Sequence, residues 1–335
     1  MALDKLDEVK EILLGLFPGL NTSELKFGNK GNGEPVWNHY HVSIPPSNSN
    51  FLKSPYFFNR PSVVHFSNVF ALTSILSEKS LRLYNLNHLN DPREFTFASK
   101  IFDLGNERIK DAKNNLHIMS FCEHEILSGP NTRTEFNMWR LYGNQGKGLA
   151  LVFSIQNNPE HWNDFHLSKV VYGAKNRRRF DELKTKLESL NATQPTIEVD
   201  LSKLYVFHKP LMYDLEKEVR LVFDRRNIRA GLHGRTKSQN GKQVFPIIKT
   251  DLHKLTQLGQ DSTYLEIPIY FHSSNSFDED IPVLKLEQII LGYGLNEEIP
   301  RITSILREQC KEKIGYIPEI KQSRLHKYYW DSKKK

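Results

Sequence analysis

The spacing of apolar residues predicts a chain in which helices and strands alternate. Residues 3–17 carry apolar positions at helical spacing among acids and lysines, which predicts an amphipathic helix. Further helices are predicted over residues 69–79, 94–113, 136–143, 175–190 and 297–312. Short alternating or β-branched runs predict strands over residues 36–44, 62–68, 81–85, 116–124, 149–155, 167–173, 213–223, 264–269, 286–292 and 316–323. Strands follow strands in the second half, so the pattern favours an α+β fold with mixed or antiparallel sheets.

The same pattern predicts how the chain is organised. Residues 1–60 combine a helix, a strand and Asn/Gly/Pro-rich turns, and we interpret them as an extension packed on the main domain. Stronger signals begin at residue 61, and residues 61–330 are predicted to form a single α+β domain. Residues 226–262 are polar and contain glycines, which is typical of an insertion into that domain.

Two helix starts carry capping residues. Ser67 or Asn68 precedes the helix of residues 69–79, and Phe70, Ile75 and Leu76 are compatible with one buried face of it.

The second start lies in the stretch "LYNLNHLNDPREF", residues 83–95. Asn90 and Asp91 can bond their own backbone, Pro92 suits the first helical position, and Glu94 completes a capping box with Asp91. A capped helix start explains this turn structurally, and its N-terminus could also border an anion-binding site.

Composition bounds the class of protein. The chain has 335 residues, of which 39% are hydrophobic and 20 are Phe, enough for an ordered core. No apolar run approaches the roughly 20 residues that cross a bilayer, and the first helix is too charged for a signal peptide. Two distant cysteines give no disulfide framework and no zinc pattern. We therefore expect a soluble, cytoplasmic protein.

The net charge of +7 includes three local basic clusters. They are residues 175–180, 224–229 and 333–335. Such clusters can bind nucleic acid or can simply solvate the surface, and the sequence leaves both interpretations open.

Familiar catalytic motifs are absent, but three features could carry chemistry. The sequence has no dinucleotide loop, phosphate-binding loop, zinc helix or nucleophile elbow. His65 lies in the middle of a predicted strand, where it is either a core residue or a ligand-binding residue. Glu216 and Glu218 have period-two spacing and are expected on one face of a strand, which would raise the pKa of one carboxyl. Trp139 and Tyr142 lie three residues apart on a predicted helical face, where they could pack in the core or stack on a flat ring.

These segments resemble a known family in their order along the chain. "VVHFSN", "LNDPREF", "MSFCEH", "MWRLYGNQGKGLALVF", "LEKEVRLVF" and "LEQIILG" are similar to the pattern of bacterial domain-of-unknown-function family 2971. The resemblance runs from about Ser62 to Trp330, with Tyr84 and the insertion as departures.

A more distant resemblance, in order and spacing alone, is to the ADP-ribosyltransferases. It implies a split-sheet domain with peripheral helices that binds NAD as a substrate between two small sheets. The implied catalytic residues are Glu218, Glu216 and His65: Glu218 fixes the ribose, Glu216 orients or deprotonates the acceptor, and His65 holds the ribose edge. The implied cofactor-binding residues are His65, Arg82, Asn90, Asp91, Trp139, Tyr142 and Arg220, and no metal is required.

The resemblance implies an NAD-dependent ADP-ribosyltransferase or NAD glycohydrolase. Such an enzyme could be a bacterial toxin or anti-phage defence effector that modifies a nucleic acid or a protein and is controlled by an antitoxin partner. Two alternatives stay open: a non-catalytic nucleic-acid-binding or interaction protein that uses the basic clusters, and a nuclease with a divalent ion held by Asp91, Glu94, Glu216 and Glu218.

Overall fold

The computed structural model of the chain shows two compact units. Unit 1 consists of Met1–Asn59, Leu86–Leu116 and His166–Asp214, and unit 2 consists of Arg60–Asn85, His117–Phe165 and Leu215–Lys335. Within these units the structure describes residues 2–16, 26–29, 39–43, 56, 58, 60–88, 92–101, 105–159, 162, 165–174, 177–192, 196–200, 202–225, 247–251, 262–272, 281–295 and 298–331.

Unit 2 is built on one open, mostly antiparallel sheet. Its strands run in the order β12-β13-β4-β5-β3-β6-β14-β15, and β11 pairs with β5 outside this path. The pair β14–β15 is parallel. The bounds are β3 Ser62–Ser67, β4 Ser80–Asn85, β5 Leu116–Glu123, β6 Leu149–Ile155, β11 Glu218–Asp224, β12 Ile247–Asp251, β13 Ser262–Pro268, β14 Leu284–Leu291 and β15 Glu319–Gln322. Together with its helices, this sheet confirms the α+β class expected from the sequence.

Strand β5 joins two ladders of the sheet. Near its start, β5 pairs with Tyr84 and Asn85 of β4, which continues into β13 and β12. Near its end, it pairs with Val63 and Val64 of β3, which continues into β6. The residues of β5 that pair with β4 and those that pair with β3 are therefore separated by Ser120 and its two neighbours.

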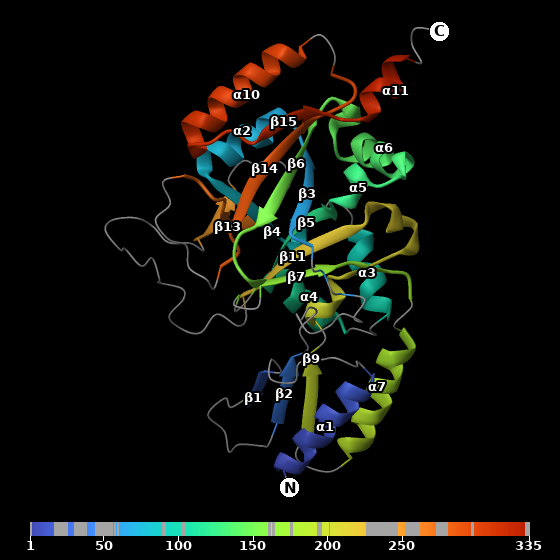
Figure 1. Cartoon of the computed structure of the whole chain (residues 1–335). Coiled ribbons are helices and arrows are strands. Elements are labelled where there is room, and N and C mark those ends of the chain that lie inside the picture. Colours follow the sequence, from blue (N-terminus) through green and yellow to red (C-terminus); the bar gives the residue numbers. More distant parts are fainter. Residues whose placement is uncertain are drawn as a thin grey trace, which may run out of the picture. The chain divides into compact units, whose positions relative to one another are not determined.

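Helices lie on both sides of this sheet. Figure 1 shows α10 and α2 on one side of the strands β14, β6 and β3, with α5 and α6 on the other. Among the described helices, none is long and apolar enough to cross a membrane. The bounds in unit 2 are α2 Val69–Glu78, α5 Glu125–Ser128, α6 Thr132–Leu141, η3 Asn144–Gly146, α10 Ile299–Ile314 and α11 Leu325–Asp331.

Unit 1 combines distant parts of the chain. Strand β2 pairs antiparallel with β1 and parallel with β9, so the N-terminal segment shares a small sheet with residues 196–200. Helix α1 packs against α7, and β8 pairs with β10. The bounds are α1 Ala2–Leu16, β1 Lys26–Asn29, β2 His39–Ser43, η2 Leu86–His88, α3 Pro92–Ile101, α4 Asn106–Asn115, β8 Val171–Tyr172, α7 Arg177–Leu190, β9 Thr196–Asp200, α8 Ser202–Tyr205 and β10 His208–Lys209. Three described elements cross from one unit to the other along the chain: β5, whose first residue Leu116 belongs to unit 1, β7 Phe165–Lys169 and η5 Leu211–Glu216.

The helix starts agree with the sequence in part. Helix α3 begins at Pro92 as predicted, whereas Asn90 and Asp91 lie outside the described residues, so the predicted capping box stays a prediction. The single helix expected over residues 94–113 is wrong, because α3 and α4 are separate helices. The expected burial of Phe70 is also wrong: this residue is 87% exposed, and Leu72 and Leu76 form the buried face of α2.

Asn68 caps helix α2, and its replacement by alanine tests how much this cap stabilises the protein. The Asn68 side chain accepts a hydrogen bond of 3.0 Å from the backbone N–H of Ala71. We expect Asn68→Ala to lower the free energy of unfolding by about 1 kcal/mol, because a helical N–H loses its acceptor. Urea unfolding measures this change, and Ser74→Ala, an exposed position within the same helix, serves as the control. Equal stability of the two variants would contradict a stabilising cap.

Candidate functional site

One face of the sheet in unit 2 carries charged side chains. Cross-strand partners point to the same face of a sheet, so Arg82 lies with its partner Glu266, and Tyr84 lies with its partners Tyr264 and Ile118. We call this surface the charged face.

Strand β11 adds its charged residues to the same face. The ring of Phe223 contacts that of His117, with centroids 6.2 Å apart, so these two residues share the opposite face. Because side chains alternate along a strand, Glu218 and Arg220 point to the charged face with Ile118 of β5. Strand alternation thus brings Arg82, Glu218 and Arg220 to one side of the sheet.

Glu216 is held by the tyrosine that follows α6. The Tyr142 hydroxyl donates to Glu216 Oε1 over 2.5 Å. Glu216 is buried, with 6% of its surface exposed, whereas Tyr142 is 46% exposed. The pair therefore offers a partly open aromatic ring beside a buried carboxylate.

The backbone between the two acids differs from the predicted strand. Glu216 ends η5, β11 begins at Glu218, and Lys217 between them has a φ of 44°. A left-handed non-glycine residue costs about 1–2 kcal/mol and occurs mostly at special sites. The expectation of a continuous strand through both acids is wrong, although both side chains are buried.

Glu218 and Arg220 form a buried ion pair. Arg220 Nε donates to Glu218 Oε1 over 2.7 Å, and a second guanidinium nitrogen donates to Oε2 over 3.2 Å. Each side chain is only 3% exposed. Two donors on one carboxylate fix its orientation and keep a negative charge in the protein interior.

Arg82 occupies a second charged position on this face. It donates to both oxygens of Glu78, over 2.5 and 3.2 Å, and its guanidinium lies 4.5 Å from the centre of the Tyr264 ring. A guanidinium that is stacked on an aromatic ring is well suited to recognising phosphate or carboxylate groups.

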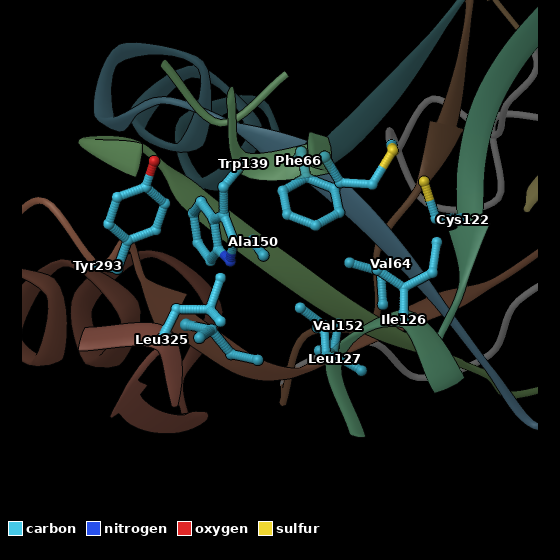
Figure 2. Close-up of a cluster of buried hydrophobic side chains, with 12 residues drawn as sticks. Val64, Phe66, Cys122, Ile126, Leu127, Trp139, Ala150, Val152, Tyr293 and Leu325 are labelled. Carbon is cyan, nitrogen blue, oxygen red and sulfur yellow. The ribbon is translucent and has the colours of Figure 1, made fainter. Parts of the chain in front are cut away.

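Trp139 and Tyr142 have different environments. Trp139 is fully buried in the cluster drawn in Figure 2, where it lies close to Ala150 and Leu325. The centroid of its ring is 5.1 Å from that of the Phe66 ring. Core packing accounts for Trp139, so stacking on a ligand falls to Tyr142 alone.

His65 lies on the opposite face. Its ring contacts Phe121, with centroids 6.1 Å apart, and Nδ1 lies 3.2 Å from the carbonyl oxygen of Ser120 on β5. Because a carbonyl only accepts, Nδ1 donates and Nε2 is the acceptor of the neutral ring. Burial lowers the pKa of His65, which the hydrogen bond to Ser120 opposes in part. The structure does not bring this histidine to the acids.

Asn90 and Asp91 lie outside the described residues, as does the Glu94 side chain. Within the described part of the chain, no group of three His, Cys, Asp or Glu side chains is arranged to hold a metal ion.

Sequence reasoning missed two residues of the charged face, Tyr264 and Glu266. Both are buried on β13, with 6% and 3% of their surfaces exposed. In "TYLEI", Tyr264 and Glu266 alternate with the apolar Leu265 and Ile267, which indicates that the strand has one polar face. The sequence does not show which strand pairs with this one, because that pairing is decided by the tertiary structure.

Comparison with known proteins agrees with part of the predicted resemblance. A family model described as Protein of unknown function (DUF2971) matches residues 138–221, which confirms the predicted resemblance over this segment. The segment begins in α6, ends in β11, and contains Tyr142, Glu216, Glu218 and Arg220. No curated protein and no solved structure matches the chain.

The buried ion pair predicts a coupled effect on stability. Glu218→Gln and Arg220→Met should each lower the free energy of unfolding by about 3–5 kcal/mol, because each leaves a buried charge without its partner. The double variant should lose clearly less than the sum of the two single losses. Urea unfolding of the four proteins measures this coupling.

The exposed pair of Lys186 and Glu182, 2.9 Å apart, provides the control. Glu182→Gln should change stability by less than about 1 kcal/mol. Additive losses at Glu218 and Arg220 would show that the two charges do not stabilise each other.

The lowered pKa of His65 predicts a pH dependence of stability. Below its ordinary value of 6.5 the unfolded chain binds a proton that the folded protein resists, so stability falls as the pH decreases. His65→Gln should flatten this decline by up to about 1.4 kcal/mol per pH unit. Unfolding at several pH values from 7 downwards, with exposed His272→Gln as the control, measures the difference in slope. The pKa of His124 is also lowered by burial, so part of the decline should remain. An unchanged slope in His65→Gln would contradict the assignment.

Proposed function

We propose that the chain is an NAD-consuming enzyme, an ADP-ribosyltransferase or an NAD glycohydrolase. The observation that carries this proposal is the pair Tyr142–Glu216, in which a partly exposed aromatic side chain donates to a buried carboxylate. A second buried carboxylate, Glu218, follows two residues later along the chain. In the proposed reaction the bond between nicotinamide and ribose breaks, and positive charge develops on the ribose.

Tyr142, Glu218 and Glu216 each have a role in the proposed reaction. A flat nicotinamide ring stacks on Tyr142, as flat rings do on aromatic side chains. Glu218, fixed by two bonds from Arg220, supplies a negative charge that needs no reorganisation when the ribose becomes positive. Glu216 accepts the proton of the attacking group, which is an acceptor hydroxyl or amine in a transferase and water in a glycohydrolase.

The pairing of β5 supports the same proposal. Strand β5 pairs with β4 near its start and with β3 near its end, which is compatible with the two small sheets that the resemblance to the ADP-ribosyltransferases implies. Arg82 is suited to a diphosphate, although it must share its guanidinium between Glu78 and the ligand. His65 on the opposite face is left without a role in this proposed site.

The proposal also covers the acceptor of ADP-ribose and the biological role of the enzyme. Exposed Arg177, Arg178 and Arg179 in the first turn of α7 favour a polyanionic acceptor such as nucleic acid. A toxin or anti-phage role, with a controlling partner in the cytoplasm, would follow from an enzyme that depletes NAD or modifies such an acceptor.

Nicotinamide release by the purified chain tests the proposed function. We expect Glu216→Gln to lower kcat by about 10²–10⁴-fold, because the amide keeps the shape of the side chain but cannot accept the proton. Tyr142→Phe should also lower kcat, because the Glu216 carboxylate loses the hydroxyl that holds it in place. Reactions with and without RNA or DNA distinguish transfer to nucleic acid from hydrolysis.

Glu308→Gln is the matched control, since Glu308 is an exposed glutamate on α10. It should retain wild-type turnover. Wild-type turnover in Glu216→Gln would remove this residue from the reaction, and absence of nicotinamide release by the wild-type chain under all conditions would refute the proposed function.

A further inference from the structure

Helix α6, which ends beside Tyr142, is fixed by a buried carboxylate. Glu135 is only 1% exposed, so its carboxylate lies in the protein interior. Its Oε1 accepts from the Trp139 indole over 3.2 Å and from the Ser323 hydroxyl over 2.9 Å, and its Oε2 accepts from Arg324 Nε over 2.5 Å. Three donors compensate a charge that would otherwise be costly to bury.

Two of these donors come from a segment near the C-terminus. The backbone N–H of Ser323 is itself bonded to the carbonyl of Leu291 at the end of β14, over 2.8 Å. Leu325, the first residue of α11, packs in the same core cluster as Trp139, and Tyr329 packs against that cluster. Figure 2 shows Leu325 beside the Trp139 ring. The segment 323–329 therefore ties α6 to the sheet by polar and apolar contacts together.

Glu135 and Trp139 lie four residues apart on one side of α6, and Tyr142 is the residue that caps the C-terminus of this helix. The backbone N–H of Tyr142 donates to the carbonyl of Met138 over 2.9 Å, so Tyr142 is attached to the last turn of α6. The contact that fixes Glu135 therefore also limits how the helix can rotate or shift at its C-terminal end. At that end, the Tyr142 hydroxyl reaches Glu216 over 2.5 Å.

We propose that Glu135, Ser323 and Arg324 are positioning residues that hold Tyr142 on Glu216. The proposal rests on the proposed function, since it assigns to the C-terminal segment control over the geometry of that same site. Arg324 acts through α6 and touches no substrate. Loss of its ion pair lets α6 shift and weakens the contact between the Tyr142 hydroxyl and the Glu216 carboxylate.

Kinetics of full-length variants test the role of Arg324. Arg324→Met should lower kcat about 10-fold or more and change the KM for NAD by less than about 3-fold, because a misplaced catalytic group affects the reaction more than binding. Arg324→Lys, which keeps the charge, should recover most of the loss. Lys327→Met removes an exposed cation from the same segment and should behave as the wild type.

A double variant separates positioning from a general loss of stability. In the Tyr142→Phe background, Arg324→Met should cost no more than about 2-fold, because the contact that it positions is already absent. Independent, multiplicative losses in the two variants would overturn the proposal.

A spectroscopic measurement decides the question even if the chain does not consume NAD. The protein is labelled with 3-fluorotyrosine, and the ¹⁹F signal of Tyr142 is assigned by its absence from Tyr142→Phe. Arg324→Met should shift or broaden this signal, and Lys327→Met should leave it in place. If Arg324→Met does not fold, Ser323→Ala, which removes a single donor, replaces it. An unchanged Tyr142 signal would overturn the positioning role, whereas a shifted signal without nicotinamide release would refute only the proposed function.

Discussion

Strand β5 is the constraint on which the arrangement of unit 2 depends. It is the strand that pairs with both ladders, through Tyr84 and Asn85 at its start and through Val63 and Val64 at its end, and it also pairs with β11. The backbone N–H of Glu123 reaches Lys217 over 3.0 Å, so the end of β5 also fixes the residue between the two acids. A shift of one residue in the register between β5 and β4 would turn over β5, and β11 with it, so that Arg82 and Glu218 would no longer share a face.

Buried charge is the second organising feature of unit 2. Glu218 and Glu135 are both buried acids that pair with an arginine, and Glu135 also accepts from Trp139 and Ser323. Pairs of this kind contribute little net stability against an apolar core, but breaking one is costly, so they select one arrangement among several. The two pairs differ in what they join: Glu218 and Arg220 are two residues apart on one strand, whereas Glu135 and Arg324 join segments 189 residues apart.

Local patterns predicted much of unit 2 and little of unit 1. The strands β3, β5, β6 and β14 could be predicted from the sequence because their apolar runs are bounded by turn residues. Helix α2 could be predicted because the capping residue Asn68 precedes it. Strand β9 was missed, since its residues 196–200 show little pattern and are fixed as a strand by pairing with β2. The separate helices α3 and α4 were predicted as one, because helical spacing alone does not reveal an interruption between two helices.

The sequence by itself determined the α+β class, most strand positions, and the residue types available for chemistry, because these depend on local periodicity and composition. Only the tertiary structure decided which of those residues share a face. The left-handed Lys217 interrupts the alternation assumed for Glu216 and Glu218, and the face of His65 is set by its pairing with β6 and its packing on Phe121. The burial of Trp139, the exposure of Tyr142 and the partners of Glu135 likewise depend on segments far apart in the chain, and no local pattern records such contacts.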